Sequence, residues 1–217
     1  MNLAKIIDYT ILKPETSKAE IQKVIEEAKY YNFFAVCVAP MWVAYAAKSL
    51  RDSKVKVCTV VGFPLGANTS EIKAYEAKDT LLNGADEVDI VINISALKSA
   101  HYKKVVTDIK AVIEVVKGNK VKAIIETGVL TDEEKIKACE LVKQAKADFI
   151  QTSTGFIGGG ANVKDIALMR EVVGGNMGIK ASGGIYTADK ALKMVEAGAT
   201  RIGISAGIAI LKSFASH

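Results

Sequence analysis

The chain has 217 residues, of which 50% are apolar, 24% charged and 6% aromatic, and its formal net charge is +5. This length and apolar content suit one large domain better than two small ones, and no Ser/Pro/Gly-rich linker divides the chain, so residues 1–217 are predicted to form a single domain. Its basic residues are mostly scattered lysines with only three arginines, which argues against nucleic-acid binding, and no apolar run approaches the roughly 20 residues that span a bilayer.

Short apolar runs recur along the whole chain, and each is predicted to be a buried strand. The first run ends at Lys13-Pro14 and the second stops at Pro40, because proline cannot continue a strand in the middle of a sheet. The predicted strands cover residues 6–12, 35–39, 55–61, 87–92, 121–127, 148–151, 178–182 and 201–205.

Amphipathic segments with helix-capping signals lie between these runs. Ser17 with Glu20, and Thr131 with Glu134, have the spacing of a capping box, in which two side chains satisfy the first backbone amides of a helix. The predicted helices begin at Ser17 and Thr131, cover residues 42–50, 68–83 and 99–116, and begin again after Asn162 and at Thr187.

The predicted strands are nearly continuously apolar and do not alternate with polar residues. Strands that are buried on both faces, as in parallel sheets, have this composition. Eight strand–helix units in about 220 residues therefore predict an α/β fold, a closed (β/α)8 TIM barrel, with a doubly wound open sheet as the alternative. In such a barrel the reacting groups lie at the carboxyl ends of the strands.

Three polar side chains, Asp89, Gln151 and Lys180, interrupt otherwise apolar strands. A buried charge is costly without a partner, so we expect Asp89 and Lys180 to form an ion pair. The residues alone leave open whether this pair relays a proton or only supports packing. All three precede polar or glycine-rich strand ends, which favours a role in catalysis.

Glycine-rich turns follow the last two predicted strands. Gly183-Gly184 follows residues 180–182, and residues 203–207 follow the final strand. Barrels often bind phosphate on backbone amides of the loops after strands seven and eight. Either turn alone is weak evidence, but two turns at successive strands predict a phosphate site.

The cysteines and histidines carry little chemistry. The chain has three cysteines, Cys37, Cys58 and Cys139, an odd number without metal-ligand spacing. This favours a reduced, cytoplasmic protein without a metal. Cys37 is interpreted as a core thiol. His101 lies on a predicted surface helix and His217 is the last residue, so neither a Ser-His-Asp triad nor a histidine metal site is expected.

Two further features are informative. Glu126 precedes Thr127 at a predicted strand end. The sequence leaves open whether its carboxylate takes part in chemistry or caps the backbone amide of a neighbouring loop. Residues 1–5 lack the apolar core of a signal peptide, so none is expected.

Several short motifs, in order along essentially the whole chain, resemble those of deoxyribose-phosphate aldolases. They lie at residues 7–14, 35–38, 60–66, 84–89, 152–156, 180–184 and 201–203. The resemblance implies a class I aldolase barrel, often dimeric, that needs no metal or cofactor. Such enzymes reversibly cleave 2-deoxyribose 5-phosphate to glyceraldehyde 3-phosphate and acetaldehyde.

In that family a lysine directly before Thr-Ser-Thr-Gly forms the Schiff base, and here this position holds Gln151. The resemblance implies that Lys180 lowers the pKa of the nucleophile and that Asp89 moves protons. The lone pair of a carboxamide nitrogen is delocalised, so Gln151 cannot form an iminium. The predicted catalytic set is therefore Asp89, Gln151 and Lys180, with the family reaction slowed by roughly 10³-fold or more.

Other predicted site residues surround this set. The predicted substrate- and phosphate-binding residues are Asp8, Thr10, Thr152, Thr154, Gly155, Gly183, Gly184, Gly203 and Ser205. Tyr9, Tyr186 and Ala206 differ from the residues usual in the family and are expected at the same barrel mouth, where Tyr186 and Ala206 would weaken the phosphate site.

Three interpretations remain open. The chain is an impaired aldolase, a repurposed aldolase with Lys180 as its nucleophile, or a non-catalytic sugar-phosphate binder. A different phosphate-binding barrel enzyme is disfavoured because no catalytic histidine is in place. The expected partners are a small phosphorylated sugar or aldehyde and a second copy of the chain, with no nucleic acid and no membrane.

Overall fold

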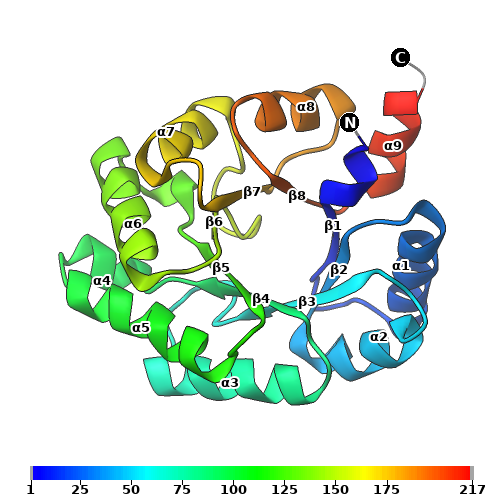
Figure 1. Cartoon of the computed structure of the whole chain (residues 1–217), viewed down its shortest axis with the longest axis horizontal. Coiled ribbons are helices and arrows are strands. Elements are labelled where there is room, and N and C mark those ends of the chain that lie inside the picture. The colour runs from blue at the N-terminus through cyan, green and yellow to red at the C-terminus, as the bar shows by residue number, and fades with distance from the viewer. Residues whose placement is uncertain (1, 216–217) are drawn as a thin grey trace.

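The computed structural model describes residues 2–215, and within them eight parallel strands form a closed barrel in chain order (Figure 1). The last strand pairs with the first, with Ile202 beside Ile7, which closes the ring. The strands are β1 (Ile7–Ile11), β2 (Ala35–Val38), β3 (Lys56–Val61), β4 (Glu87–Val91), β5 (Lys120–Ile124), β6 (Phe149–Gln151), β7 (Gly178–Ser182) and β8 (Arg201–Ile204). The predicted (β/α)8 barrel is confirmed, and the open sheet is excluded.

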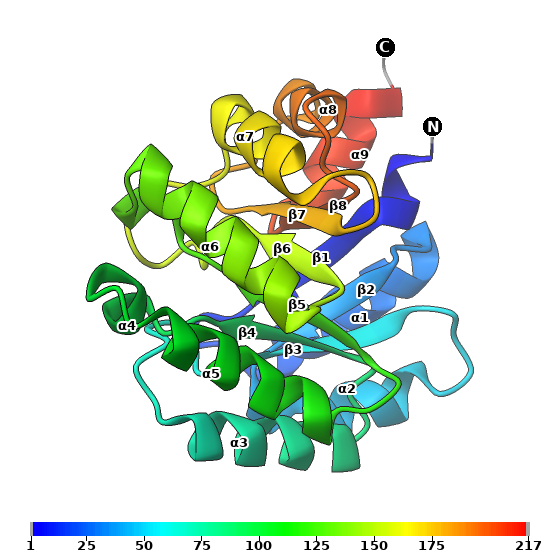
Figure 2. The same cartoon turned by 60° about the vertical axis from the view of Figure 1, so that its left-hand side comes forward.

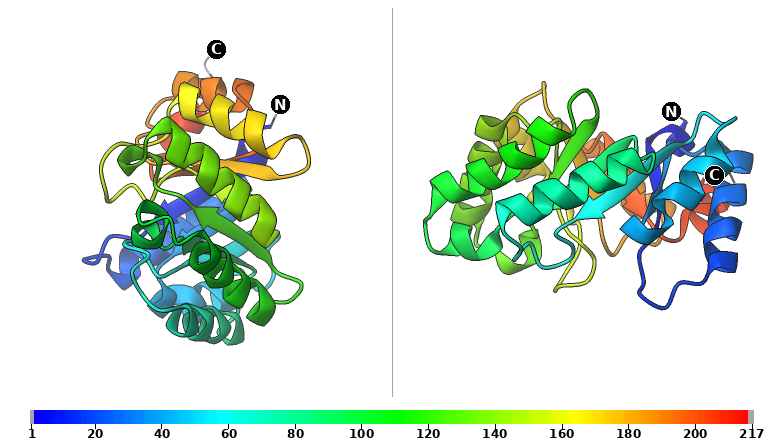
Figure 3. Two further views of the ribbon diagram at one scale, coloured as in Figure 1. Left: turned by 90° about the vertical axis from the view of Figure 1, so that its left-hand side faces the viewer. Right: turned by 90° about the horizontal axis from the view of Figure 1, so that it is seen from below.

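Helices surround the barrel on the outside (Figures 1 and 2). They are α1 (Lys18–Tyr31), α2 (Val43–Leu50), α3 (Ser70–Leu82), α4 (Ile94–Lys98), α5 (Tyr102–Val115), α6 (Asp132–Ala145), α7 (Val163–Val173), α8 (Ala188–Glu196) and α9 (Gly207–Ala215), with 3-10 turns at Leu3–Ile6, Pro40–Trp42 and Thr127–Val129. The Leu3–Ile6 turn lies beside α9, so the two ends of the described chain meet at one edge of the barrel (Figure 3).

Local capping explains where most helices begin. Both predicted capping boxes, at Ser17 and Thr131, are confirmed by reciprocal hydrogen bonds with Glu20 and Glu134. The helix predicted from residue 68 begins two residues later, at Ser70, because the Thr69 side chain caps it by accepting the Ile72 amide.

The helix predicted over residues 99–116 is confirmed as α5 (Tyr102–Val115), but the short helix α4 (Ile94–Lys98) before it was not predicted. Asn93 caps a separate short helix, α4, through the Ala96 amide. Ala100 then adopts a left-handed backbone with φ 55°, and α5 begins at Tyr102. A non-glycine residue with positive φ interrupts a helix, and nothing in its side chain signals that conformation in the sequence.

Two kinds of core lie on the two faces of the strands. Outward-facing residues such as Val88, Val121 and Ile179 pack against the helices in the main apolar core. Inside the barrel the apolar residues are fewer, and they include a small cluster of Ala35, Cys37, Cys58 and Val60. The rest of the interior is largely polar, so the barrel interior is where chemistry is to be sought. No helix among residues 2–215 is long and apolar enough to cross a membrane.

Candidate active site

Charged side chains on five strands meet inside the barrel and pair with one another. Asp89 on β4 bridges two ammonium groups, with its Oδ1 2.7 Å from Lys122 Nζ and its Oδ2 2.6 Å from Lys180 Nζ. The predicted Asp89–Lys180 ion pair is therefore confirmed. Lys180 is also 2.6 Å from Asp8, and Lys122 is 2.7 Å from Glu87.

Arg201 completes this interior network. Its Nη1 lies 2.8 Å from Asp8 and 3.1 Å from Glu87, and its guanidinium carbon lies 3.5 Å from the centre of the Phe34 ring. The network thus contains three carboxylates (Asp8, Glu87, Asp89) and three cations (Lys122, Lys180, Arg201), all buried. Its charges balance, which is how so many ions are tolerated inside one barrel.

Pairing keeps Asp8 and Lys180 ionised although they are buried. Burial alone would raise the pKa of Asp8, but the charges of Lys180, Lys122 and Arg201 outweigh it and hold that pKa well below the ordinary value. Burial alone would lower the pKa of Lys180, but the charges of Asp8 and Asp89 outweigh it and raise that pKa. The Lys180 amine is therefore protonated at neutral pH.

A cavity of about 490 Å³ opens above this network at the carboxyl ends of the strands. Its floor includes the three predicted catalytic residues Asp89, Gln151 and Lys180. The predicted binding residues that also line it are Thr10, Thr154, Gly155, Gly183, Gly184, Gly203 and Ser205. Phe63 and Phe156, from the loops after β3 and β6, stand edge to face across the mouth with ring centroids 5.1 Å apart.

Two predicted binding residues lie behind the cavity wall. Asp8 is fully buried in the ion-pair network, and Thr152 is fully buried with its hydroxyl donating to the Ser182 carbonyl at 3.0 Å. Neither lines the cavity. Their positions support the residues that do, and direct contact with a substrate is not favoured for either.

Gln151 ends β6 and occupies the centre of the cavity floor. Strand register places it beside Ile124 on β5 and Lys180 on β7. Its side-chain nitrogen donates to the Ser182 hydroxyl at 3.0 Å, and the residue is only 5% exposed. Its carboxamide oxygen is buried and has no hydrogen-bond partner in the described part of the chain.

The glycine-rich loops after β7 and β8 form one side of the cavity. Gly183 and Gly184 have φ of 81° and 67°, a left-handed conformation that glycine adopts without strain. Gly203 serves a different purpose, since a Cβ there would lie 2.9 Å from the Lys180 side chain. Lys190 on α8 donates to the Gly184 carbonyl at 2.9 Å, which brings an ammonium next to this loop.

Comparisons with known proteins agree along the full chain. A family model described as DeoC/LacD family aldolase matches residues 3–213. The chain belongs to this aldolase family. It is 63% identical over 212 residues to a protein of Enterococcus faecalis named deoxyribose-phosphate aldolase, covering 97% of this chain and 96% of that relative.

Solved structures of aldolases have the same fold. A putative deoxyribose-phosphate aldolase from Coccidioides immitis superposes with a TM-score of 0.96 at 40% identity, covering 99% of this chain and 86% of the other. A deoxyribose phosphate aldolase from Aeropyrum pernix, whose structure is described as a unique tetramer, gives a TM-score of 0.92 at 31% identity, covering 99% and 91%. The resemblance found in the sequence motifs is thereby confirmed.

Of the three residues that were expected to differ from the aldolase pattern, two border the cavity or lie next to it. Tyr186 lines the cavity and is 67% exposed, and Ala206 directly follows the lining residue Ser205. The expectation that Tyr9 lies at the barrel mouth is wrong, because its ring packs on Phe33 and its hydroxyl donates to Glu27 on α1 at 2.7 Å. Tyr9 is a core residue of the outer layer.

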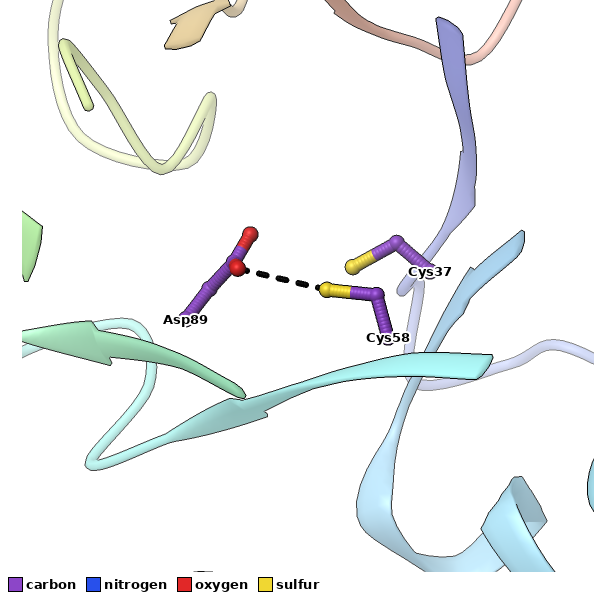
Figure 4. A group of neighbouring side chains, drawn as sticks. All are labelled: Cys37, Cys58 and Asp89. Carbon is purple, nitrogen blue, oxygen red and sulfur yellow. Dashed lines mark hydrogen bonds between the residues drawn. The ribbon is translucent and has the colours of Figure 1, made fainter. Parts of the chain in front are cut away.

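Cys37 and Cys58 stand side by side on β2 and β3, next to Asp89 (Figure 4). Cys37 is buried, as predicted, but it also lines the cavity. The Cys58 thiol donates to Asp89 at 3.2 Å, and burial raises its pKa well above the ordinary value. Metal binding needs thiolates and free carboxylate oxygens, and both oxygens of Asp89 are engaged by lysines, so the donor set does not favour a metal.

The interpretation of Glu126 as a cap for a loop amide is confirmed. Its Oε2 accepts the Thr154 backbone amide at 3.1 Å and the Thr154 hydroxyl at 2.5 Å, while its own backbone is left-handed with φ 56°. Its Oε1 is buried without a partner among the described residues, and burial raises the pKa of Glu126 above its ordinary value. Glu126 therefore fixes the loop that carries Gly155 and Phe156 over the cavity.

We expect Glu126→Gln to change how stability depends on pH. The folded-state pKa of Glu126 is raised, so its ionisation destabilises the fold as pH rises from the unfolded-state value of about 4.3 through the folded value. The glutamine cannot ionise and still offers an acceptor to Thr154. Relative to the parent, the variant should gain stability between about pH 4 and 7 in urea unfolding.

Glu133→Gln is a matched control, in which the change of stability with pH should have the opposite sign to that in Glu126→Gln. The pKa of Glu133, at the start of α6, is lowered by a hydrogen bond with its own backbone amide and by the Thr131 side chain. Its ionised form stabilises the fold above the unfolded-state pKa, so Glu133→Gln should lose stability relative to the parent as pH rises. A parallel trend for the two variants would contradict the role given to Glu126.

Sequence reasoning missed three charged members of the interior network: Lys122, Glu87 and Arg201. Lys122 carried a usable signal, because it interrupts the apolar run of β5 as Lys180 interrupts that of β7. His101 has no place in this site, because it is exposed at the start of α5. His217 lies outside the described residues.

Proposed function

We propose that this chain is a deoxyribose-phosphate aldolase scaffold that binds 2-deoxyribose 5-phosphate and its cleavage products but has lost the Schiff-base step. The phosphate would lie against the glycine loops after β7 and β8, near Lys190. The aldehyde carbon would lie at the floor, between Asp89, Lys180 and Gln151.

The observation that carries this proposal is the state of the amines at the cavity floor. Attack on a carbonyl needs a neutral amine, and the amide nitrogen of Gln151 has no available lone pair. Lys180 has carboxylates of two residues at 2.6 Å, and Lys122 has two at 2.7 Å. Burial alone would lower the pKa of Lys122, but the charges of Asp89 and its neighbours raise it well above the ordinary value.

Calorimetric binding and a retro-aldol assay on one preparation test the proposal. We expect 2-deoxyribose 5-phosphate to bind measurably, with turnover lower by roughly 10³-fold or more than that of the Gln151→Lys variant. Undetectable binding would overturn the proposed binding function. Turnover equal to that of the variant would overturn the proposed loss of the Schiff-base step.

A substitute nucleophile at Lys180 is the alternative, and trapping with acetaldehyde and borohydride separates the two. We expect no reduced adduct on the peptide that carries Lys180, because both ion pairs hold its amine protonated. The Gln151→Lys variant, treated in parallel, should carry an adduct on the peptide with position 151. An adduct on Lys180 in the parent would establish the alternative.

We also propose that the chain acts in the cytoplasm as a homodimer. The reduced cysteines support the compartment, since Cys37, Cys58 and Cys139 are free and buried. Light scattering should give twice the chain mass of 23.2 kDa. A fourfold mass would match the tetramer described for the Aeropyrum pernix relative instead.

A further inference from the structure

The Ser182 hydroxyl fixes which way the Gln151 carboxamide points. Ser182 Oγ lies 2.6 Å from the Ser153 carbonyl oxygen, which can only accept, so the single hydroxyl proton of Ser182 is used there. The group that faces Ser182 Oγ at 3.0 Å must then donate. Only the nitrogen of the Gln151 amide can do so, and the carbonyl oxygen is turned the other way.

This leaves an unused hydrogen-bond acceptor at the floor of the cavity. Gln151 Oε1 is buried and has no partner within residues 2–215, although the residue lines the cavity. Ser153 Oγ, two residues along the same chain segment, is likewise buried and unpartnered at this cavity. A buried carbonyl without a donor costs free energy, so a donor brought by a ligand is favoured there.

We propose that the cavity selects phosphorylated polyols, which carry a hydroxyl at the carbon where the family's substrate carries its aldehyde. This inference rests on the proposed phosphosugar-binding function. An alcohol can donate its proton to Gln151 Oε1. An aldehyde has only an accepting oxygen, so it leaves Gln151 Oε1 unpaired and places a second acceptor nearby.

The surrounding charges add to this preference. Lys180 and Asp89 are already paired with each other, and Asp89 accepts from Lys122 as well. Among residues 2–215, the Gln151 carboxamide oxygen is thus a neutral acceptor left unused at the floor, beside the unpartnered Ser153 hydroxyl. No covalent bond to the ligand is available to offset the desolvation of this oxygen. The unused acceptor therefore favours an alditol phosphate over the open-chain aldehyde form of the sugar phosphate.

Two ligands that differ by one hydroxyl test the proposal. They are 2-deoxyribitol 5-phosphate and 1,2-dideoxyribitol 5-phosphate, which has a methyl group in place of the terminal alcohol. We expect calorimetry to show roughly tenfold tighter binding of the first by the parent chain, the size of one net hydrogen bond. The sugar itself does not discriminate, because its ring form also carries a hydroxyl at that carbon.

A substitution at position 151 identifies the acceptor. Gln151→Met has a similar length without a carbonyl oxygen, so it should bind the two ligands within about twofold of each other. Gln144→Met places the same substitution on the exposed face of α6 and should keep the tenfold preference. Circular dichroism of each variant reports whether it is folded.

The outcomes separate this inference from the function on which it rests. Equal affinity of both ligands for the parent would overturn the polyol preference and leave phosphosugar binding intact. A preference that persists in folded Gln151→Met would overturn the assignment to Gln151. Failure of both ligands and of 2-deoxyribose 5-phosphate to bind would overturn the proposed function together with the inference.

Discussion

Replacing Gln151 with lysine is expected to raise the rate of 2-deoxyribose 5-phosphate cleavage by roughly 10³-fold or more. The rest of the floor is in place, because Asp89 and Lys180 line the same cavity and are 2.6 Å apart. The new amine would stand beside Lys180, its register partner on β7. From there it can attack a carbonyl held in the cavity.

The balance of charge decides which amine becomes the nucleophile. The three carboxylates Asp8, Glu87 and Asp89 are already matched by Lys122, Lys180 and Arg201. A fourth cation therefore has no carboxylate of its own and lies next to like charge. Burial and that repulsion both lower the pKa of the amine at position 151, so it is the one that loses its proton near neutral pH.

A coupled retro-aldol assay that follows glyceraldehyde 3-phosphate measures the gain. Gln144→Lys adds the same side chain on the exposed face of α6 and should leave the rate at the parent level. Borohydride trapping should place the adduct on the peptide with position 151. A folded Gln151→Lys variant without gain would show that Tyr186 and the residues around it have changed the cavity itself.

The barrel could be predicted because each strand is recognisable from the composition of its own short segment. Runs such as residues 35–38 and 56–61 are apolar and short, and capping boxes mark where the helices begin. The short helix α4 was missed, and its separation from α5 depends on a left-handed backbone at Ala100 that the sequence does not signal. Sequence patterns indicate where strands and helices occur. They indicate less well where the backbone leaves these regular conformations.

The interior network was predictable only in part. Asp89 and Lys180 are conspicuous because each interrupts an apolar strand, and their ion pair follows from barrel closure. Arg201 and Asp8 are 193 positions apart and meet only because β8 pairs with β1. Their partnership depends on the register of a closed sheet, which the sequence does not display. The same limit explains why the sequence did not show that Asp8 is buried in the ion-pair network and does not line the cavity.

Replacing Lys122 with methionine is expected to destabilise the fold by about 3–5 kcal/mol at pH 7. Lys122 is fully buried and lies 2.7 Å from both Glu87 and Asp89 and 3.8 Å from Asp8. Methionine fills similar volume but leaves three carboxylates against two cations in the interior. The uncompensated charge, more than any lost packing, produces the penalty.

The pH dependence of that penalty identifies its electrostatic origin. In the parent, burial alone would raise the pKa values of Asp8 and Asp89, but neighbouring cations lower them, so their stabilisation is present above about pH 4 and is lost as pH falls through the folded values. Without Lys122 those pKa values rise, and one carboxylate can take up a proton. The difference between variant and parent should therefore be smaller near pH 5 than at pH 7.

Urea unfolding at the two pH values measures this, with Lys120→Met as the matched control on the same strand. Lys120 pairs with Asp148 at 2.6 Å but its side chain is 58% exposed, so its loss should cost less than about 1 kcal/mol. Adding Glu87→Gln to Lys122→Met removes the excess negative charge and should recover part of the stability. Equal penalties at positions 120 and 122, or a penalty at 122 that does not change with pH, would mean that the interior lysine contributes by packing and not by its charge.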